Sequence, residues 1–319
     1  MTDAERCEGL KPHIAGVDRG NPALACERED ANVLPFVLPF CFAPLLVSPE
    51  RRLPLPRPAP ISDNKERAVT QQSEPTVSEP IFNLPFAVIA TVVVLVLVHA
   101  FRAFVLSDDQ DIQFLYTFAF IPARYSADSA FPGGFGAELW TFFTYAFIHA
   151  DLMHLGLNLA WLIPFGTALA RRLGTWRYSV FMLVMAALGA LTHLVTHFGA
   201  MEPMIGASAA ISGAMAAALR FVFQPNGPLE RWRERSDAAY QVPAASLAAT
   251  LRDPRFLLFL VVWLGLNVLF GLGTVSFGTE AGQEIAWQAH VGGFFAGLLL
   301  FNFFDPVIPR SELDTEPSA

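Results

Sequence analysis

The run LPFAVIATVVVLVLVHAFRAFVL, residues 84–106, decides the fold class of this chain. Its only ionisable residues are His99 and Arg102, near its end. An α-helix of about 20 apolar residues crosses the hydrocarbon core of a bilayer. Comparable runs recur downstream, at about 147–169, 178–198, 206–223, 256–274 and 285–304. The sequence therefore predicts an all-α, polytopic membrane protein with six spans.

Composition agrees with this prediction and excludes one class of function. Of the 319 residues, 53% are hydrophobic and 16% charged, and the formal net charge is -8. A protein that binds nucleic acid through phosphate contacts needs a basic face, so we expect no nucleic-acid partner. The only cysteines are Cys7, Cys26 and Cys41, and all three lie before the first span. No disulfide and no cysteine-based metal site can therefore organise the spans.

The chain divides into three regions by composition. Residues 1–80 are rich in proline and in charges of both signs, which predicts a mostly disordered region. Residues 81–306 form the membrane domain, and residues 307–319 a short tail. Arginine and lysine gather before the first span and between spans two and three and spans four and five, so we expect those connections and both termini to be cytoplasmic. No Arg-rich, acid-poor presequence is found, which favours a bacterial inner membrane.

Polar side chains at membrane depth are costly, so each one is a candidate for function. The candidates are His99, Arg102, His149, His154, Asn158, His193, His197, Ser208, Ser212 and His290.

Ser208 falls in the first turn of the fourth span, after the helix-breaking Pro203 and Gly206. A helix N-terminus offers free backbone N–H groups and the positive end of the dipole, which suit a developing oxyanion. A plain helix cap is the alternative for this serine.

His290 shares a helix face with Gly293 and Gly297 in the sixth span. Such small residues let a neighbouring helix approach closely, which would press His290 against it. A histidine that reaches the membrane interface is the alternative.

His149, His154 and Asn158 form the most informative cluster, in the second span. His154 and Asn158 are four residues apart, so both can donate hydrogen bonds from one helix face. An amide in hydrocarbon is unfavourable unless it is satisfied. A structural hydrogen bond between helices is the alternative.

His193 and His197 also share a face, but the Glu of a His-Glu-x-x-His zinc site is missing. We interpret this pair as polar packing near the interface, and expect no metal and no cofactor.

A serine, a histidine and several donors in the outer halves of spans two, four and six supply the roles that acyl transfer needs. No carboxylate in the spans is placed to complete a triad, so a Ser-His dyad is the economical interpretation.

Four motifs in this order resemble the rhomboid family of intramembrane serine proteases. They are Glu138-Leu-Trp140, His149-x4-His154-x3-Asn158, Gly206-Ala-Ser208 and Ala289-His290-x2-Gly293-x3-Gly297, and the resemblance covers about residues 81–306.

The resemblance implies a six-helix bundle that cleaves transmembrane segments of single-pass or polytopic membrane proteins within the lipid bilayer. Ser208 would attack the scissile carbonyl and His290 would take its proton. Asn158, His154 and the Ser208 N–H would form the oxyanion hole. His149 would support the outer loop and the water entering the site, Glu138 and Trp140 would belong to a membrane-embedded outer loop, and the fifth span would be a lateral gate.

Four positions depart from the family's usual residues: Ala209 for glycine, Thr141 for arginine, Ser212 for an aromatic residue and Ala170 for glutamate. None of them removes a residue of the dyad or of the oxyanion hole. A catalytically silent rhomboid-like protein that binds membrane clients is the main alternative, but such a protein normally lacks the serine or the histidine, and both are present here. A transporter with mid-membrane histidines is another, but it would require paired broken helices or internal repeats, which the sequence lacks.

Overall fold

The computed structural model describes residues 83–126, 131–231, 236–272 and 286–307, which all belong to one unit, Glu74–Ala319. Within these ranges the chain is helical and has no strand, apart from an isolated antiparallel bridge between Phe120 and Met204. The predicted all-α class is confirmed for these residues. The predicted N-terminal region, 1–80, and the tail after Val307 lie outside them.

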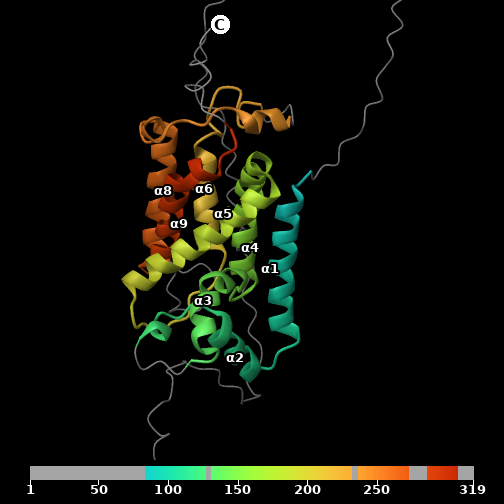
Figure 1. The fold of residues 1–319 in the computed structure, drawn as a ribbon, viewed down its shortest axis with the longest axis vertical. Coiled ribbons are helices and arrows are strands. Elements are labelled where there is room, and N and C mark those ends of the chain that lie inside the picture. Colours follow the sequence, from blue (N-terminus) through green and yellow to red (C-terminus); the bar gives the residue numbers. More distant parts are fainter. Residues whose placement is uncertain (1–82, 127–130, 232–235, 273–285, 308–319) are drawn as a thin grey trace, which may run out of the picture. The chain divides into compact units, whose positions relative to one another are not determined.

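Long helices dominate the described part of the chain (Figure 1). Among the described residues, three helical stretches are long and apolar enough to cross a membrane: α1 (Phe86–Phe104), the stretch Leu152–Thr196 and α8 (Pro254–Gly271). Helix α9 (Trp287–Phe304) has 18 residues, and α6 (Ser208–Leu219) has only 12. The count of six spans therefore stays a prediction.

The second and third predicted spans lie in one helical stretch that is interrupted at Gly174. The stretch Leu152–Thr196 comprises α4 (Leu152–Trp161), a π-helical turn η4 (Leu162–Gly166) and α5 (Thr167–Thr196). The turn contains Pro164, which has no N–H to donate within a helix. At Gly174 the backbone leaves the helix, with φ 73° and ψ 166°, and glycine tolerates this conformation. Gly174 thus divides α5 into two helical segments within the predicted connection between spans two and three.

The connection between the first two spans folds into helices. They are α2 (Asp108–Phe118), η2 (Pro122–Tyr125), α3 (Gly134–Thr144) and η3 (Tyr145–Phe147). Ser107 and Gln110 form a reciprocal capping box that begins α2. The aromatic content of this segment led us to expect more than a solvated loop, and the structure agrees.

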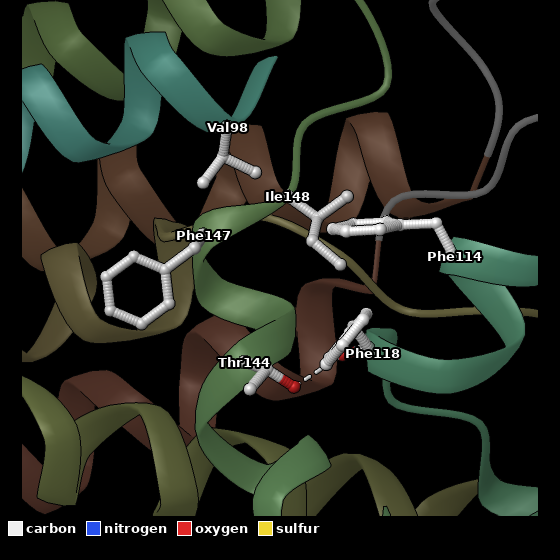
Figure 2. A pocket seen from close by; sticks show the side chains of 6 residues that line it. All are labelled: Val98, Phe114, Phe118, Thr144, Phe147 and Ile148. Carbon is white, nitrogen blue, oxygen red and sulfur yellow. Dashed lines mark hydrogen bonds between the residues drawn. The ribbon is translucent and has the colours of Figure 1, made fainter. Parts of the chain in front are cut away.

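A small apolar pocket lies where this connection, residues 108–147, here called the outer segment, meets α1 (Figure 2). Its lining consists of Val98, Phe114, Phe118, Thr144, Phe147 and Ile148. Thr144 Oγ1 donates to the Phe118 carbonyl at 2.6 Å, which joins the end of α3 to the end of α2. None of the predicted site residues lines this pocket.

Helix α6 lies at the centre of the bundle, packed against α5 and α9 (Figure 1). All of its residues from Ala209 to Leu219 are buried. A Cβ added to Gly293 would collide with the Ala209 carbonyl, and one added to Gly297 with the backbone of Gly213. Helices α6 and α9 therefore touch backbone to backbone, as the small residues predicted. This contact sets the distance between Ser208 and His290.

Two buried arginines tie the helices together at the other end of α6. Arg172 forms a bidentate ion pair with Asp305, with N–O distances of 2.9 and 2.8 Å. It also donates to two backbone carbonyls, that of Tyr240 within η5 (Asp237–Gln241) and that of Val242 directly after it. Arg220 donates to the carbonyls of Leu298 and Ala245, the latter just before α7 (Leu247–Thr250). These bonds fix the ends of α5, α6 and α9.

Candidate active site

Ser208 and His290 lie in direct contact. Ser208 Oγ is 2.6 Å from His290 Nε2, although the residues are 82 positions apart in the chain. Ser208 is the first residue of α6 and His290 lies in the first turn of α9. Both side chains are partly exposed. The pair has the geometry of a hydroxyl nucleophile and its base.

Gly206 brings the turn before α6 against α4. Its φ is 112°, in the region that only glycine adopts freely, and its N–H donates to the Tyr145 carbonyl at 3.0 Å. A Cβ at this position would lie 2.7 Å from His154 Nε2 and 3.7 Å from Ser208 Oγ. The missing side chain therefore leaves the space between His154 and Ser208 open.

His154 presents a proton donor to that space. The Asp151 carboxylate caps α4 by accepting from the His154 N–H at 2.7 Å. The His154 Nδ1 accepts from the Ala150 N–H at 3.4 Å, so the ring proton resides on Nε2, the nitrogen that lies beside Gly206.

Asn158 is buried one turn further along α4. Its Nδ2 donates to the His154 carbonyl at 2.9 Å, which leaves the second amide proton for another acceptor. Its Oδ1 is buried and has no hydrogen-bond partner among the described residues. A polar group left in this state is typical of a functional site.

His149 is fully buried, and its ring meets the His154 ring edge-on with a centroid distance of 5.1 Å. Its carbonyl accepts from Arg102 Nη1 at 2.8 Å, and Arg102 also forms a bidentate ion pair with Asp111. His149 thus belongs to a junction between α1, α2 and α4.

Glu138 and Trp140 lie on α3. Trp140 Nε1 donates to the Thr117 carbonyl at 3.0 Å, and the Tyr125 hydroxyl donates to the Glu138 carbonyl at 2.8 Å. These bonds fasten α3 to α2 and η2 and involve neither Ser208 nor His290.

The four departures from the family pattern have identifiable surroundings. Thr141 is buried and donates to the Ala137 carbonyl. Another residue, Arg124, contributes an arginine to the outer segment, where it donates to the carbonyls of Tyr116 and Pro132. The Ser212 hydroxyl donates to the Ser208 carbonyl at 2.7 Å. Ala209 meets Gly293, as described above, and Ala170 lies in the core.

His193 and His197 stack on one another with a centroid distance of 4.4 Å, and Thr196 Oγ1 bonds His197 Nδ1. Within the described ranges, no group of three or more His, Cys, Asp or Glu residues could hold a metal ion.

Asn267 on α8 belongs to the candidate site but is not among the residues predicted from the sequence. Its Oδ1 lies 2.6 Å from His290 Nδ1, on the side of the ring opposite Ser208. An amide within an apolar span was the signal that identified Asn158, and the same signal applies to Asn267.

Comparisons with known proteins point to one family. The Rhomboid domain family model matches residues 136–304, which is more than half of the chain. The chain is 27% identical over 174 residues to rhomboid-like protease 3 of Toxoplasma gondii, covering 54% of each protein. It is 26% identical over 175 residues to the rhomboid protease GlpG of Pectobacterium atrosepticum, covering 54% of this chain and 51% of that protein.

The match thus spans about half the length of these curated relatives. It contains the segments that carry Ser208, His290, His154 and Asn158. The match of the family model and the apolar helices together show an integral membrane protein, and the chain belongs to the rhomboid family.

Proposed function

We propose that this protein is an intramembrane serine endopeptidase that cleaves transmembrane segments of other membrane proteins. The observation that carries the proposal is the 2.6 Å contact between Ser208 Oγ and His290 Nε2. Membership of the rhomboid family and two relatives that are named proteases support it.

The first half of the reaction forms an acyl-enzyme. Ser208 Oγ attacks the scissile carbonyl carbon and its proton passes to His290 Nε2. The carbonyl oxygen becomes an oxyanion, which accepts hydrogen bonds from His154 Nε2, Asn158 Nδ2 and the Ser208 N–H. The C–N bond then breaks, and His290 returns the proton to the leaving amine.

In the second half, a water molecule attacks the acyl carbon while His290 Nε2 takes one of its protons. The C–Oγ bond breaks, the acid product leaves, and the proton returns to Ser208 Oγ. Because hydrolysis consumes water, the site must be shielded from lipid, and the polar groups of α4, α6 and α9 provide that surrounding.

The chemistry also limits the substrates. A peptide bond inside a helix is protected by backbone hydrogen bonds, so the enzyme acts on spans that Gly, Pro or polar residues weaken near the outer face. Such spans belong to single-pass or polytopic proteins and reach the site from lipid past α8, which acts as the lateral gate.

The proposed orientation of the protein in its membrane rests on the distribution of basic residues. We place the protein in a bacterial inner membrane with both termini cytoplasmic, since arginine and lysine gather on that side. Digestion of intact inverted vesicles with an external protease would remove the terminal regions, and digestion of right-side-out vesicles would leave them intact.

Cleavage of a reporter transmembrane segment by the purified protein tests the proposal. Ser208→Ala and His290→Ala each abolish cleavage and remain folded. Ser212→Ala is the matched control, because Ser212 lies one turn along the same helix, and it retains activity. EDTA has no effect.

Cleavage that survives Ser208→Ala, or that EDTA inhibits, would overturn the proposal. Absence of cleavage by the wild-type protein, together with binding of membrane clients, would favour the catalytically silent alternative.

A further inference from the structure

His290 is held from both sides. Its Nε2 contacts Ser208 Oγ on α6, and its Nδ1 lies 2.6 Å from Asn267 Oδ1 on α8. Two helices therefore fix the plane of the imidazole ring, in addition to the helix that carries it.

The hydrogen bonds of Asn267 determine which ring nitrogen carries the proton. Asn267 Nδ2 donates to the Trp263 carbonyl at 2.8 Å. A backbone carbonyl only accepts, so the amide nitrogen faces it and the amide oxygen faces His290. An amide oxygen also only accepts, so the His290 Nδ1 is protonated.

The consequence for Nε2 is direct. In a neutral imidazole with the proton on Nδ1, Nε2 has a free lone pair. This is the state in which the base can accept the proton of Ser208 Oγ. The network of Trp263, Asn267 and His290 thus selects the tautomer that the proposed reaction requires.

The packing of α8 keeps Asn267 in place. One turn before it, the Trp263 ring stacks on Phe294 of α9, with a centroid distance of 4.4 Å and an interplanar angle of 24°. Phe256, fully buried near the start of α8, also faces Phe294, with a centroid distance of 6.4 Å. These contacts hold α8 against the helix that carries His290.

Ser212 does not hold His290 in this way. Its position is where the family often has an aromatic residue against the histidine, but its hydroxyl donates to the Ser208 carbonyl within α6. The second hydrogen bond of the base comes instead from α8.

We infer that Asn267 is a positioning residue, which orients His290 and keeps its proton on Nδ1, so that the site works as a Ser-His-Asn arrangement. The inference rests on the proposed protease function. When His290 becomes an imidazolium during the reaction, Asn267 Oδ1 still accepts from Nδ1 and stabilises the charge. Since Asn267 lies on α8, the base is aligned only while that helix packs against α9.

Steady-state kinetics of the full-length protein on a reporter transmembrane segment test the inference. Asn267→Leu removes the acceptor at nearly constant volume and lowers kcat about tenfold to a hundredfold, while KM changes less than about twofold. Asn267→Asp keeps an oxygen acceptor and restores most of kcat.

Asn302→Leu is the matched control. Asn302 accepts from Arg220 at the far end of α9, so this variant removes an amide hydrogen bond away from the site and retains kcat. Thermal unfolding of all variants shows whether each is folded.

Nitrogen-15 NMR of labelled histidine gives a readout that does not depend on cleavage. Wild-type His290 shows a protonated Nδ1, and Asn267→Leu shows a mixture of tautomers. Wild-type kcat or an unchanged tautomer in Asn267→Leu, with Ser208→Ala inactive, would overturn the inference alone. Absence of cleavage by the wild-type protein would overturn the proposed function and the inference with it.

Discussion

At the scale of single residues, the candidate site depends on groups that are small or fixed in orientation. Gly206 leaves space between His154 and Ser208, and its positive φ turns the chain into α6. The capped start of α4 and the Ala150 N–H together set the orientation of His154. His154, a proposed oxyanion donor, is therefore oriented before a substrate arrives, which is what stabilisation of an oxyanion requires.

Gly206→Ala should abolish cleavage for a reason other than backbone strain. The new methyl group would press on the His154 ring. Gly199→Ala is the matched control, because Gly199 also has a positive φ, of 80°, but no atom lies within 4 Å of its added Cβ. We expect Gly199→Ala to lower the unfolding temperature and keep kcat. Equal kcat values in the two variants would contradict this explanation.

Asn158→Ala should lower kcat about tenfold to a thousandfold, because it removes a proposed oxyanion donor. The value of KM should change little, since the donor acts mainly in the transition state. A variant that loses affinity for the substrate and keeps kcat would show that Asn158 serves binding. Initial rates over a range of substrate concentrations separate the two outcomes.

At the scale of elements, α8 has two different neighbours. Phe259 meets Phe165 of η4 edge-on, with a centroid distance of 6.0 Å, while Trp263 stacks on Phe294 of α9. The first contact closes the proposed gate against the second span. The second contact keeps α8 on the helix that carries His290.

Phe259→Ala should therefore raise kcat/KM for a transmembrane substrate in proteoliposomes about twofold to tenfold, the effect of losing one aromatic pair. Leu258→Ala is the control, because the Leu258 side chain is 62% exposed and makes no such contact. A short water-soluble peptide should be cleaved at an unchanged rate by both variants. Lower activity in Phe259→Ala would contradict the role of α8 as the gate.

At the scale of the whole molecule, buried arginines hold the helix ends together. The side chain of Arg172 is fully buried in its pair with Asp305, whereas the Arg255 side chain is 57% exposed in its pair with Asp253. Loss of one partner leaves an uncompensated charge in the first case and a solvated one in the second.

Arg172→Ala should destabilise the fold by about 3–5 kcal/mol. Arg255→Ala, the matched control, should cost about 0–1 kcal/mol, because solvent screens that pair. Thermal unfolding in detergent measures the difference. Similar unfolding temperatures for the two variants would show that the ion pair between Arg172 and Asp305 does not hold the helices together.

The sequence predicted a membrane protein of the rhomboid family, because the length of apolar runs and the order of motifs can be read directly along the chain. It did not predict helices α2 and α3, whose aromatic residues show no long apolar run. It placed a connection between spans two and three at the basic residues Arg171 and Arg172, and the helix is interrupted close by, at Gly174. Asn267 was missed because its partner, His290, lies in another helix and only the fold brings them together.

The most direct test of the proposed nucleophile is to map a fluorophosphonate adduct by peptide mass spectrometry. The probe reacts with an activated serine, so we expect a single adduct on Ser208, absent from His290→Ala and present in Ser212→Ala. Cleavage of the reporter should be lost in proportion to labelling. An adduct at another residue, or full cleavage by a protein labelled at Ser208, would show that Ser208 is not the nucleophile.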